Sequence, residues 1–227
     1  MVVSQGFYRK IKDWIYSEQY EGIRFRPFQT SGNPYKAKCF LVSAYPDSIL
    51  NISDEEVTLY AEALLDRKLF AHLYGETCDS KETRAIERFI TWYDAIEASP
   101  IVVTYMNSLQ VNGLPALKLA KKERTKDYVK GERLFNEVLL EFLPNCIIIH
   151  GNEALKMFRQ QYSNIMIDYH QSITKAQDLE EVGPFAEICL LSGHRVFVFA
   201  CRHMSNYTDK SLQHLKKCVE NVVKTER

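Results

Sequence analysis

Four short apolar runs, each long enough for a buried β-strand, recur along the chain and are separated by segments with helical periodicity. The runs are CFLVS (39–43), IVVTYM (101–106), CIIIH (146–150) and RVFVFAC (195–201). Strands that alternate with helices are joined by right-handed crossovers, so the pattern predicts an α/β fold with a mostly parallel sheet. The length of 227 residues favours a single domain over residues 1–227.

The segments between these runs predict helices and two further strands. Helices are expected over 7–17, from Ser53 to Gly75, over 81–98, around 135–142, over 153–161 with Asn152 as cap, and over 209–224. Residues 165–169 predict a short strand, and 187–191 predicts a strand that forms a hairpin with 195–201. Residues 22–38, which carry Pro27, Gly32 and Pro34, predict a loop.

Charge limits the ways in which this chain can bind nucleic acid. The 29 basic residues equal the 29 acidic ones, which argues against a protein that coats a polyanion by broad phosphate neutralisation. One stretch, 118–130, departs from this balance with six basic and two acidic residues. We expect it to be a loop that is either simply solvated or a contact for phosphate through Lys121, Lys122 and Arg124.

The sequence also argues against several other classes of protein. No apolar stretch approaches the roughly 18 residues of a membrane helix, and the first 20 residues lack the apolar core of a signal peptide, so we expect a cytoplasmic protein without a membrane partner. The six cysteines show no CxxC spacing, which predicts reduced buried thiols and no metal site. Because phosphate-loop, dinucleotide, nucleophile-elbow and HExxH motifs are absent, no cofactor is expected.

Polar segments follow the four apolar runs at the point where each strand ends. They are Ser43–Asp47, Thr104–Ser108, His150–Asn152 and Arg202–Asn206. Ligands of parallel α/β sheets bind at the carboxyl ends of the strands, so these four segments form a candidate site.

Three polar side chains in these segments have both a functional and a structural interpretation. His203 either stabilises a developing anion or moves a proton, or it is a surface histidine at a strand end. Asn107 either reads the edge of a base or caps a turn. His150 either faces the same crevice or is structural.

The turn after the first run carries three further candidates. Pro46 fixes the turn, and its neighbouring backbone N–H groups are suited to hold an anion. Tyr45 is suited to stack on a ring and Asp47 to act as a base. The alternative is that Tyr45 is a packed aromatic residue and Asp47 an ordinary turn carboxylate.

These strand-end segments, in this order, resemble the uracil-DNA glycosylase superfamily. Residues 32–38 with CFLVSAYPDS (39–48) resemble its first motif, and VTYMNSLQV (103–111) resembles the strand that ends in the base-reading Asn. CIIIHGNEALKMF (146–158) is similar to the family's strand–Gly–helix segment, and FACRHMSN (199–206) to its final strand and His-Pro-Ser loop.

The resemblance implies a three-layer α/β/α sandwich with a mostly parallel central sheet of about four strands. It also implies hydrolysis of the N-glycosidic bond of a uracil, or another deaminated base, flipped out of DNA. Catalysis is then assigned to His203, with Asp47 as the candidate base, and base recognition to Asn107.

Further positions follow from the same resemblance. The substrate-binding residues are Ser43, Ala44, Tyr45, Pro46, Asn107, Ser205 and Asn206. The loop that enters the duplex contains Met204 and Tyr207, and these two join Lys121, Lys122 and Arg124, which are assigned from charge alone, as the DNA-binding residues.

Three positions depart from the family pattern. Ser43 replaces the glycine of the first motif, Tyr45 replaces its water-positioning acid, and Met204 replaces the first proline of the last loop. The sequence therefore leaves three hypotheses open: a DNA glycosylase, a catalytically inactive DNA- or protein-binding module on the same fold, and a small-molecule enzyme of another α/β class.

Overall fold

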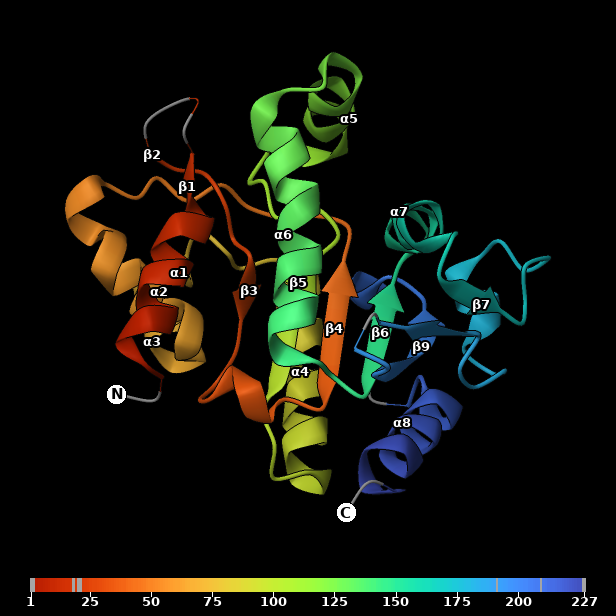
Figure 1. Ribbon diagram of the computed structural model, residues 1–227. Coiled ribbons are helices and arrows are strands. Elements are labelled where there is room, and N and C mark those ends of the chain that lie inside the picture. Colours follow the sequence, from red (N-terminus) through yellow and green to blue (C-terminus); the bar gives the residue numbers. More distant parts are fainter. Residues whose placement is uncertain (1–2, 18, 20–21, 191, 209, 226–227) are drawn as a thin grey trace.

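Four parallel strands form the centre of the sheet, as the apolar runs predict. The computed structural model describes residues 3–17, 19, 22–190, 192–208 and 210–225. The strands β4 (Cys39–Ser43), β5 (Ile101–Tyr105), β6 (Cys146–His150) and β9 (Arg195–Cys201) lie in the order β5-β4-β6-β9 (Figure 1). All three neighbouring pairs are parallel, so the four carboxyl ends meet at one edge.

The sheet is larger than predicted, because antiparallel strands extend it on both sides. β3 (Phe28–Gln29) pairs with β5, and β8 (Ala186–Cys189) pairs with β9 and with β7 (Met166–Asp168). The sheet therefore has seven strands, and the expectation of about four is wrong. Two strands, β3 and β2 (Gly22–Ile23), lie inside the predicted loop 22–38 and are only two residues long. A run that short shows no periodicity.

The predicted hairpin and short strand at the other edge are confirmed. β8 and β9 are antiparallel neighbours, and β7 lies within the predicted strand 165–169. Residue 191, the end of the predicted strand 187–191, lies outside the described residues, as does residue 209 at the start of the predicted last helix. A separate two-stranded ribbon joins β1 (Tyr16–Ser17) to β2.

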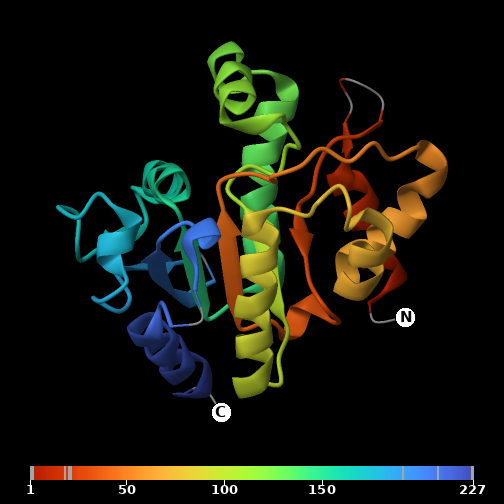
Figure 2. The ribbon, with the colours of Figure 1, turned by 180° about the vertical axis from the view of Figure 1, so that it is seen from behind.

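Helices cover both faces of the sheet (Figures 1 and 2). On one face α6 (Lys126–Phe142) and α7 (Asn152–Tyr162) pack on the centre, while α1 (Gln5–Ile15), α2 (Val57–Leu65) and α3 (Arg67–Tyr74) extend the same core beside β3. On the other face lie α4 (Lys81–Ile96) and α8 (Gln213–Thr225). Successive residues of β4 point to opposite faces, so Phe40 and Val42 join the first core and Cys39 and Leu41 the second.

Two predicted segments differ in secondary structure. The expected single helix from Ser53 to Gly75 is η2 (Asp54–Glu56), α2 and α3, because the Asp66 side chain accepts hydrogen bonds from the backbone N–H groups of Lys68 and Leu69 and starts a new helix. The basic stretch 118–130 is not a loop, since it spans α5 (Gly113–Glu123) and the first turns of α6.

The predictions on cysteines and membranes have a mixed outcome. All six cysteines are free thiols, and Cys39, Cys146 and Cys201 are buried as predicted, but Cys189 is exposed. Cys189 is the last residue of a strand near the sheet edge, where side chains meet solvent. Within the described ranges, no helix has the length and apolar character that crossing a membrane requires.

Candidate functional site

A cavity of about 290 Å³ opens at the carboxyl edge of the parallel strands. Its wall combines the segments after β4, β6 and β9 with the first turns of α4 and α5. The lining residues are Ser43, Ala44, Tyr45, Asp47, Glu82, Gly113, Leu114, His150, Gly151, Asn152, Glu153, Ala154 and His203. A hollow of about 780 Å³ lies beside α1, and one of about 470 Å³ beside α3 adjoins this cavity and shares Asp47 and Glu82 with it, but neither is lined by a histidine.

Two histidines and a carboxylate meet in this cavity. Nε2 of His203 lies 3.2 Å from one oxygen of Glu82, and Nε2 of His150 lies 3.7 Å from the other. The two imidazole centroids are 5.4 Å apart and the rings nearly perpendicular. The three residues come from α4, the end of β6 and the segment after β9, so only the folded chain brings them together.

Burial and mutual charge set the protonation of this group. Burial lowers the pKa of His150 to about 4, although Glu82 opposes the shift. Burial alone raises the pKa of Glu82, but the hydrogen bond from His203 and the charges of both histidines outweigh it and lower that pKa. The hydrogen bond with Glu82 raises the pKa of His203 against the effect of burial. At neutral pH the cavity therefore holds a neutral imidazole, a carboxylate and an imidazole with increased affinity for a proton.

A short helical turn fixes the position of His203. His203 caps η4 (Met204–Asn206): its Nδ1 lies 2.9 Å from the Ser205 hydroxyl and accepts a hydrogen bond from the Ser205 backbone N–H at 3.3 Å. On the other side of the ring lies Gly151, whose φ of +88° is unfavourable for side chains. A Cβ on Gly151 would be 2.9 Å from Cδ2 of His203, so glycine permits this approach.

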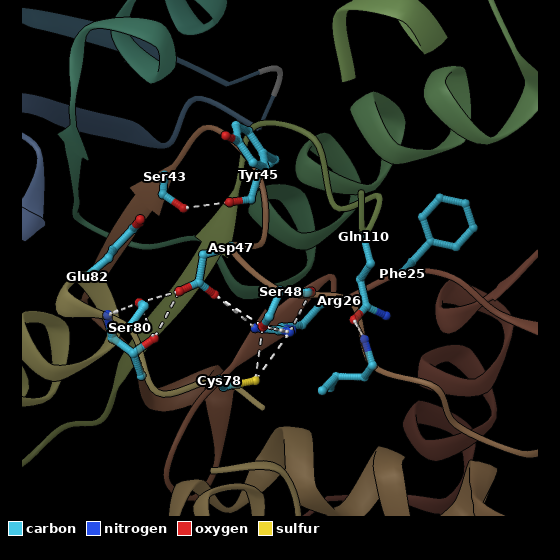
Figure 3. Close-up of polar contacts among 12 residues, drawn as sticks. Phe25, Arg26, Ser43, Tyr45, Asp47, Ser48, Cys78, Ser80, Glu82 and Gln110 are labelled. Atoms are coloured by element: carbon cyan, nitrogen blue, oxygen red, sulfur yellow. Dashed lines mark hydrogen bonds and ion pairs between the residues drawn. The ribbon is translucent and has the colours of Figure 1, made fainter. Parts of the chain in front are cut away.

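Asp47 lines the same cavity as His203, as predicted, but it is already engaged in hydrogen bonds. Its carboxylate accepts from the hydroxyls of Ser80 at 2.5 Å and Thr83 at 3.1 Å, both at the start of α4, and from Ser48 at 3.3 Å. Figure 3 shows these contacts and the ion pair with the buried Arg26 at 3.8 Å. Asp47 thus joins the turn after β4 to the helix that carries Glu82, and its side chain is 21 % exposed.

Of the other residues in the turn after β4, some line the cavity and one is buried behind it. Tyr45 is half-buried on the cavity wall, and burial raises the pKa of its phenol, which is therefore neutral at physiological pH. Ser43 and Ala44 also line the cavity, and the Ser43 hydroxyl donates to the Tyr45 carbonyl oxygen at 3.4 Å. Pro46 is buried and is not among the lining residues.

Asn107 is not brought to the cavity. It is fully buried, its amide nitrogen donates to the Tyr128 carbonyl oxygen, and its amide oxygen accepts from the Leu109 backbone N–H, both at 3.0 Å. The close packing extends to Gly131, where a Cβ would lie 2.1 Å from the Asn107 amide oxygen. In this arrangement Asn107 holds the segment after β5 against α6.

The segment after β9 also differs from the prediction. Met204 and Tyr207 are buried, so they do not form an exposed wedge for a DNA duplex. Tyr207 packs edge-on against Phe89 of α4, and its hydroxyl accepts a hydrogen bond from Lys216 of α8 at 2.7 Å. Ser205 and Asn206 between them are exposed. Apolar packing against α4 and α8 explains the difference, because it draws inward Met204 and Tyr207, which lie three residues apart around the turn η4.

The predicted basic residues lie on a helix that begins at the cavity. Lys121, Lys122 and Arg124 are exposed in the last turn of α5 and just beyond it, while Gly113 and Leu114 of the first turn line the cavity. At 1.5 Å per residue the separation along α5 is about 15 Å. Lys130, also in the stretch, donates instead to the carbonyl oxygens of Asp13 and Tyr16.

The start of α7 forms another part of the wall. Gly151, and not the predicted Asn152, is the N-cap, because the Asn152 side chain turns away and accepts from the Ala176 backbone N–H at 2.8 Å. The backbone of 152–154 lies at the cavity, where the first N–H groups of a helix favour negative charge.

Sequence reasoning missed Glu82. An acidic residue in the first turn of a helix is explained by the helix dipole alone, so nothing in the sequence marks Glu82 as a partner of His203. For His150 the strand-end position was the available signal, and of its two interpretations the structure gives the one that faces the crevice. A comparison of this sequence with models of known protein families and with curated proteins finds no match in either set.

Proposed function

We propose that the cavity is the active site of a DNA glycosylase-like hydrolase that cleaves the N-glycosidic bond of a uracil or another deaminated base flipped out of DNA. The observation that carries the proposal is that His203, Asp47 and Tyr45 line one cavity at the ends of parallel strands. A four-stranded parallel centre covered by helices on both faces agrees with the fold that the family resemblance implies.

The cavity suits a single planar ring. Its volume of about 290 Å³ stands at the lower end of ligand pockets, which span about 300–1,000 Å³. Tyr45 offers an aromatic surface on the wall, and Ser43 and the backbone of 152–154 offer polar groups. Because Asn107 is engaged elsewhere, recognition of the base edge falls to these groups in our proposal.

The charges in the cavity fit a reaction in which the base leaves as an anion. His203, with its raised pKa, supplies positive charge where negative charge grows on the departing base. Asp47 is the carboxylate available to orient the attacking water, in place of the acid that the family has at the position of Tyr45.

DNA reaches the cavity, in this proposal, along α5. Lys121, Lys122 and Arg124 contact phosphates about 15 Å from the pocket, and exposed Ser205 and Asn206 contact the strand beside it. Since the whole chain is neutral, this local charge carries the electrostatic attraction.

The test is release of a base from defined oligonucleotides. Single- and double-stranded substrates that contain uracil, hypoxanthine or xanthine are incubated with the protein, and abasic sites are detected by alkaline cleavage. We expect product from at least one substrate, and a loss of about 10²-fold or more in His203→Ala. His72→Ala, an exposed histidine of α3, is the matched control and retains the rate.

Two outcomes contradict the proposal in different ways. No abasic product from any substrate at high enzyme concentration rejects hydrolysis. The second candidate is the inactive DNA-binding module, which the replacement of the family's acid by Tyr45 supports. It is then favoured if DNA binding depends on salt, survives His203→Ala, and is lost when Lys121, Lys122 and Arg124 become alanine.

A further inference from the structure

Glu82, His150 and His203 have the separations expected of ligands to one metal ion. One donor atom from each residue lies within 4.8 Å of the other two, and Nε2 of His203 and Nε2 of His150 are 3.2 and 3.7 Å from the two different oxygens of Glu82. Ligands at 2.0–2.2 Å from a tetrahedral zinc ion lie roughly 3.3–3.6 Å apart. Small side-chain movements therefore suffice to bring all three onto a common centre.

His150 gives an independent reason to expect an ion. Its side chain is fully buried, and within the described part of the chain neither ring nitrogen has a hydrogen-bond partner. Its separation of 3.7 Å from Glu82 is too long for a direct hydrogen bond. A buried polar group without a partner in a native protein indicates a bound water or ion, and here the group faces a carboxylate and a second imidazole.

We propose that Glu82, His150 and His203 bind one divalent transition-metal ion, zinc by preference, at the wall of the cavity. Two imidazoles and one carboxylate, with a fourth position open to a cavity, form the donor set of catalytic rather than structural zinc sites. When Nε2 binds the metal, Nδ1 carries the proton and gives up the hydrogen bond from the Ser205 N–H. The Ser205 hydroxyl, 2.9 Å from Nδ1, is then placed to accept from it and to orient the ring.

The ion would take over the positive charge that the proposed function assigns to the His203 imidazolium. It would also polarise a water at its open position, within the cavity that Asp47 lines. The role in base release rests on the proposed function, whereas metal binding itself does not. The two are therefore separable by experiment.

The experiment measures zinc binding to the full chain directly. Exposed Cys189 and the Cys218–His214 pair, whose Sγ and Nε2 are 3.4 Å apart, are zinc donors themselves, so both cysteines are changed to serine in the background protein. The protein is stripped of metal with a chelator, and Zn²⁺ is then titrated in competition with a chromophoric chelator. Co²⁺ serves as a spectroscopic probe of coordination number.

We expect one Zn²⁺ per chain and a Co²⁺ spectrum of a four- or five-coordinate site without thiolate bands. Replacing a residue that only hydrogen-bonds to a metal ligand weakens metal sites by about 10–100-fold, so loss of a ligand in Glu82→Gln or His150→Ala should weaken binding by about 100-fold or more. His72→Ala is the matched control and leaves the affinity unchanged. If His150→Ala fails to fold, Glu82→Gln and His203→Asn decide, because both residues are partly exposed, Gln has the shape of Glu, and Asn keeps a polar atom near the position of Nδ1.

Absence of stoichiometric Zn²⁺ and Co²⁺ binding, or an affinity that Glu82→Gln and His203→Asn leave unchanged, overturns the metal site. If the protein binds no metal and a chelator does not affect base release, the metal site is rejected and the proposed function still stands. Zinc binding without base release has the opposite meaning: the metal site stands and the proposed hydrolysis is rejected.

Discussion

Asn107→Ala separates a structural asparagine from one that reads a base. The side chain is fully buried and makes two hydrogen bonds to the backbone at 3.0 Å: it donates to the Tyr128 carbonyl and accepts from the Leu109 N–H. Alanine leaves the Leu109 N–H buried without a partner, which costs about 1–3 kcal/mol. It also removes the extra hydrogen bond to the Tyr128 carbonyl, worth about 0.5–1.5 kcal/mol, although that carbonyl keeps its partner within α6. We therefore expect a loss of about 1.5–4.5 kcal/mol in the free energy of unfolding.

The assay is chemical and thermal unfolding of the variant beside a matched control. In a chain of this size each kcal/mol shifts Tm by about 2–4 °C, so Tm should fall by roughly 3–18 °C. Asn112→Ala is the control, because Asn112 is exposed before α5 and makes no side-chain cap hydrogen bond. Its effect should stay within about 0.5 kcal/mol.

The reasoning is refuted if Asn107→Ala unfolds like the parent protein. A variant of unchanged stability that no longer discriminates among bases would show that Asn107 leaves its backbone partners to read a substrate. The base-reading role that the family resemblance implies would then be correct.

Three further predictions concern other parts of the structure. Gly151→Ala should lower the free energy of unfolding by about 1–3 kcal/mol, because the φ of +88° at this position disfavours a side chain. The added Cβ should also displace the His203 ring, and the NMR chemical shifts of the imidazole would report that displacement. Tyr207→Ala should lower stability by about 3–5 kcal/mol, as a buried aromatic residue does; DNA affinity per folded molecule, measured by fluorescence anisotropy, should not change. Burial raises the pKa of Glu141, but the hydrogen bonds from Lys10 and Tyr35 and the charge of Lys10 together outweigh it, and the net pKa is lowered. A lowered carboxyl pKa stabilises above the unfolded value, so Glu141→Gln should lower the urea midpoint at pH 7, by less than about 1 kcal/mol of stability, and the difference should shrink as the pH falls through the lowered pKa of Glu141.

The centre of the fold was predictable from sequence, and the edges of the sheet were less so. Runs such as CIIIH are apolar on both faces, which is typical of strands buried between two helical layers. β3 has two residues, and only its pairing with β5 makes it a strand. The break between α2 and α3 depends on hydrogen bonds of Asp66, a residue that in sequence suits a helix surface equally well.

For the candidate site, sequence position identified residues but not the directions of their side chains. His203 and Asp47 line the cavity because their loops follow parallel strands, which the alternating pattern predicts. Asn107 follows a neighbouring strand yet turns into the core, where the backbone of α6 binds its amide. Met204 and Tyr207 are buried by contacts with α4, which is distant in sequence, as well as with the following helix α8, and no local pattern contains that information.

The strand order β5-β4-β6-β9 has a consequence for the timing of site formation during synthesis. The cavity draws on residues from Ser43 to His203, and β9, which precedes His203, pairs with β6 and β8 on its two sides. A nascent chain that stops before β9 can bury much of the first core but contains no complete site. Contacts between such distant segments slow folding, so ligand binding should be acquired late, after most secondary structure has formed.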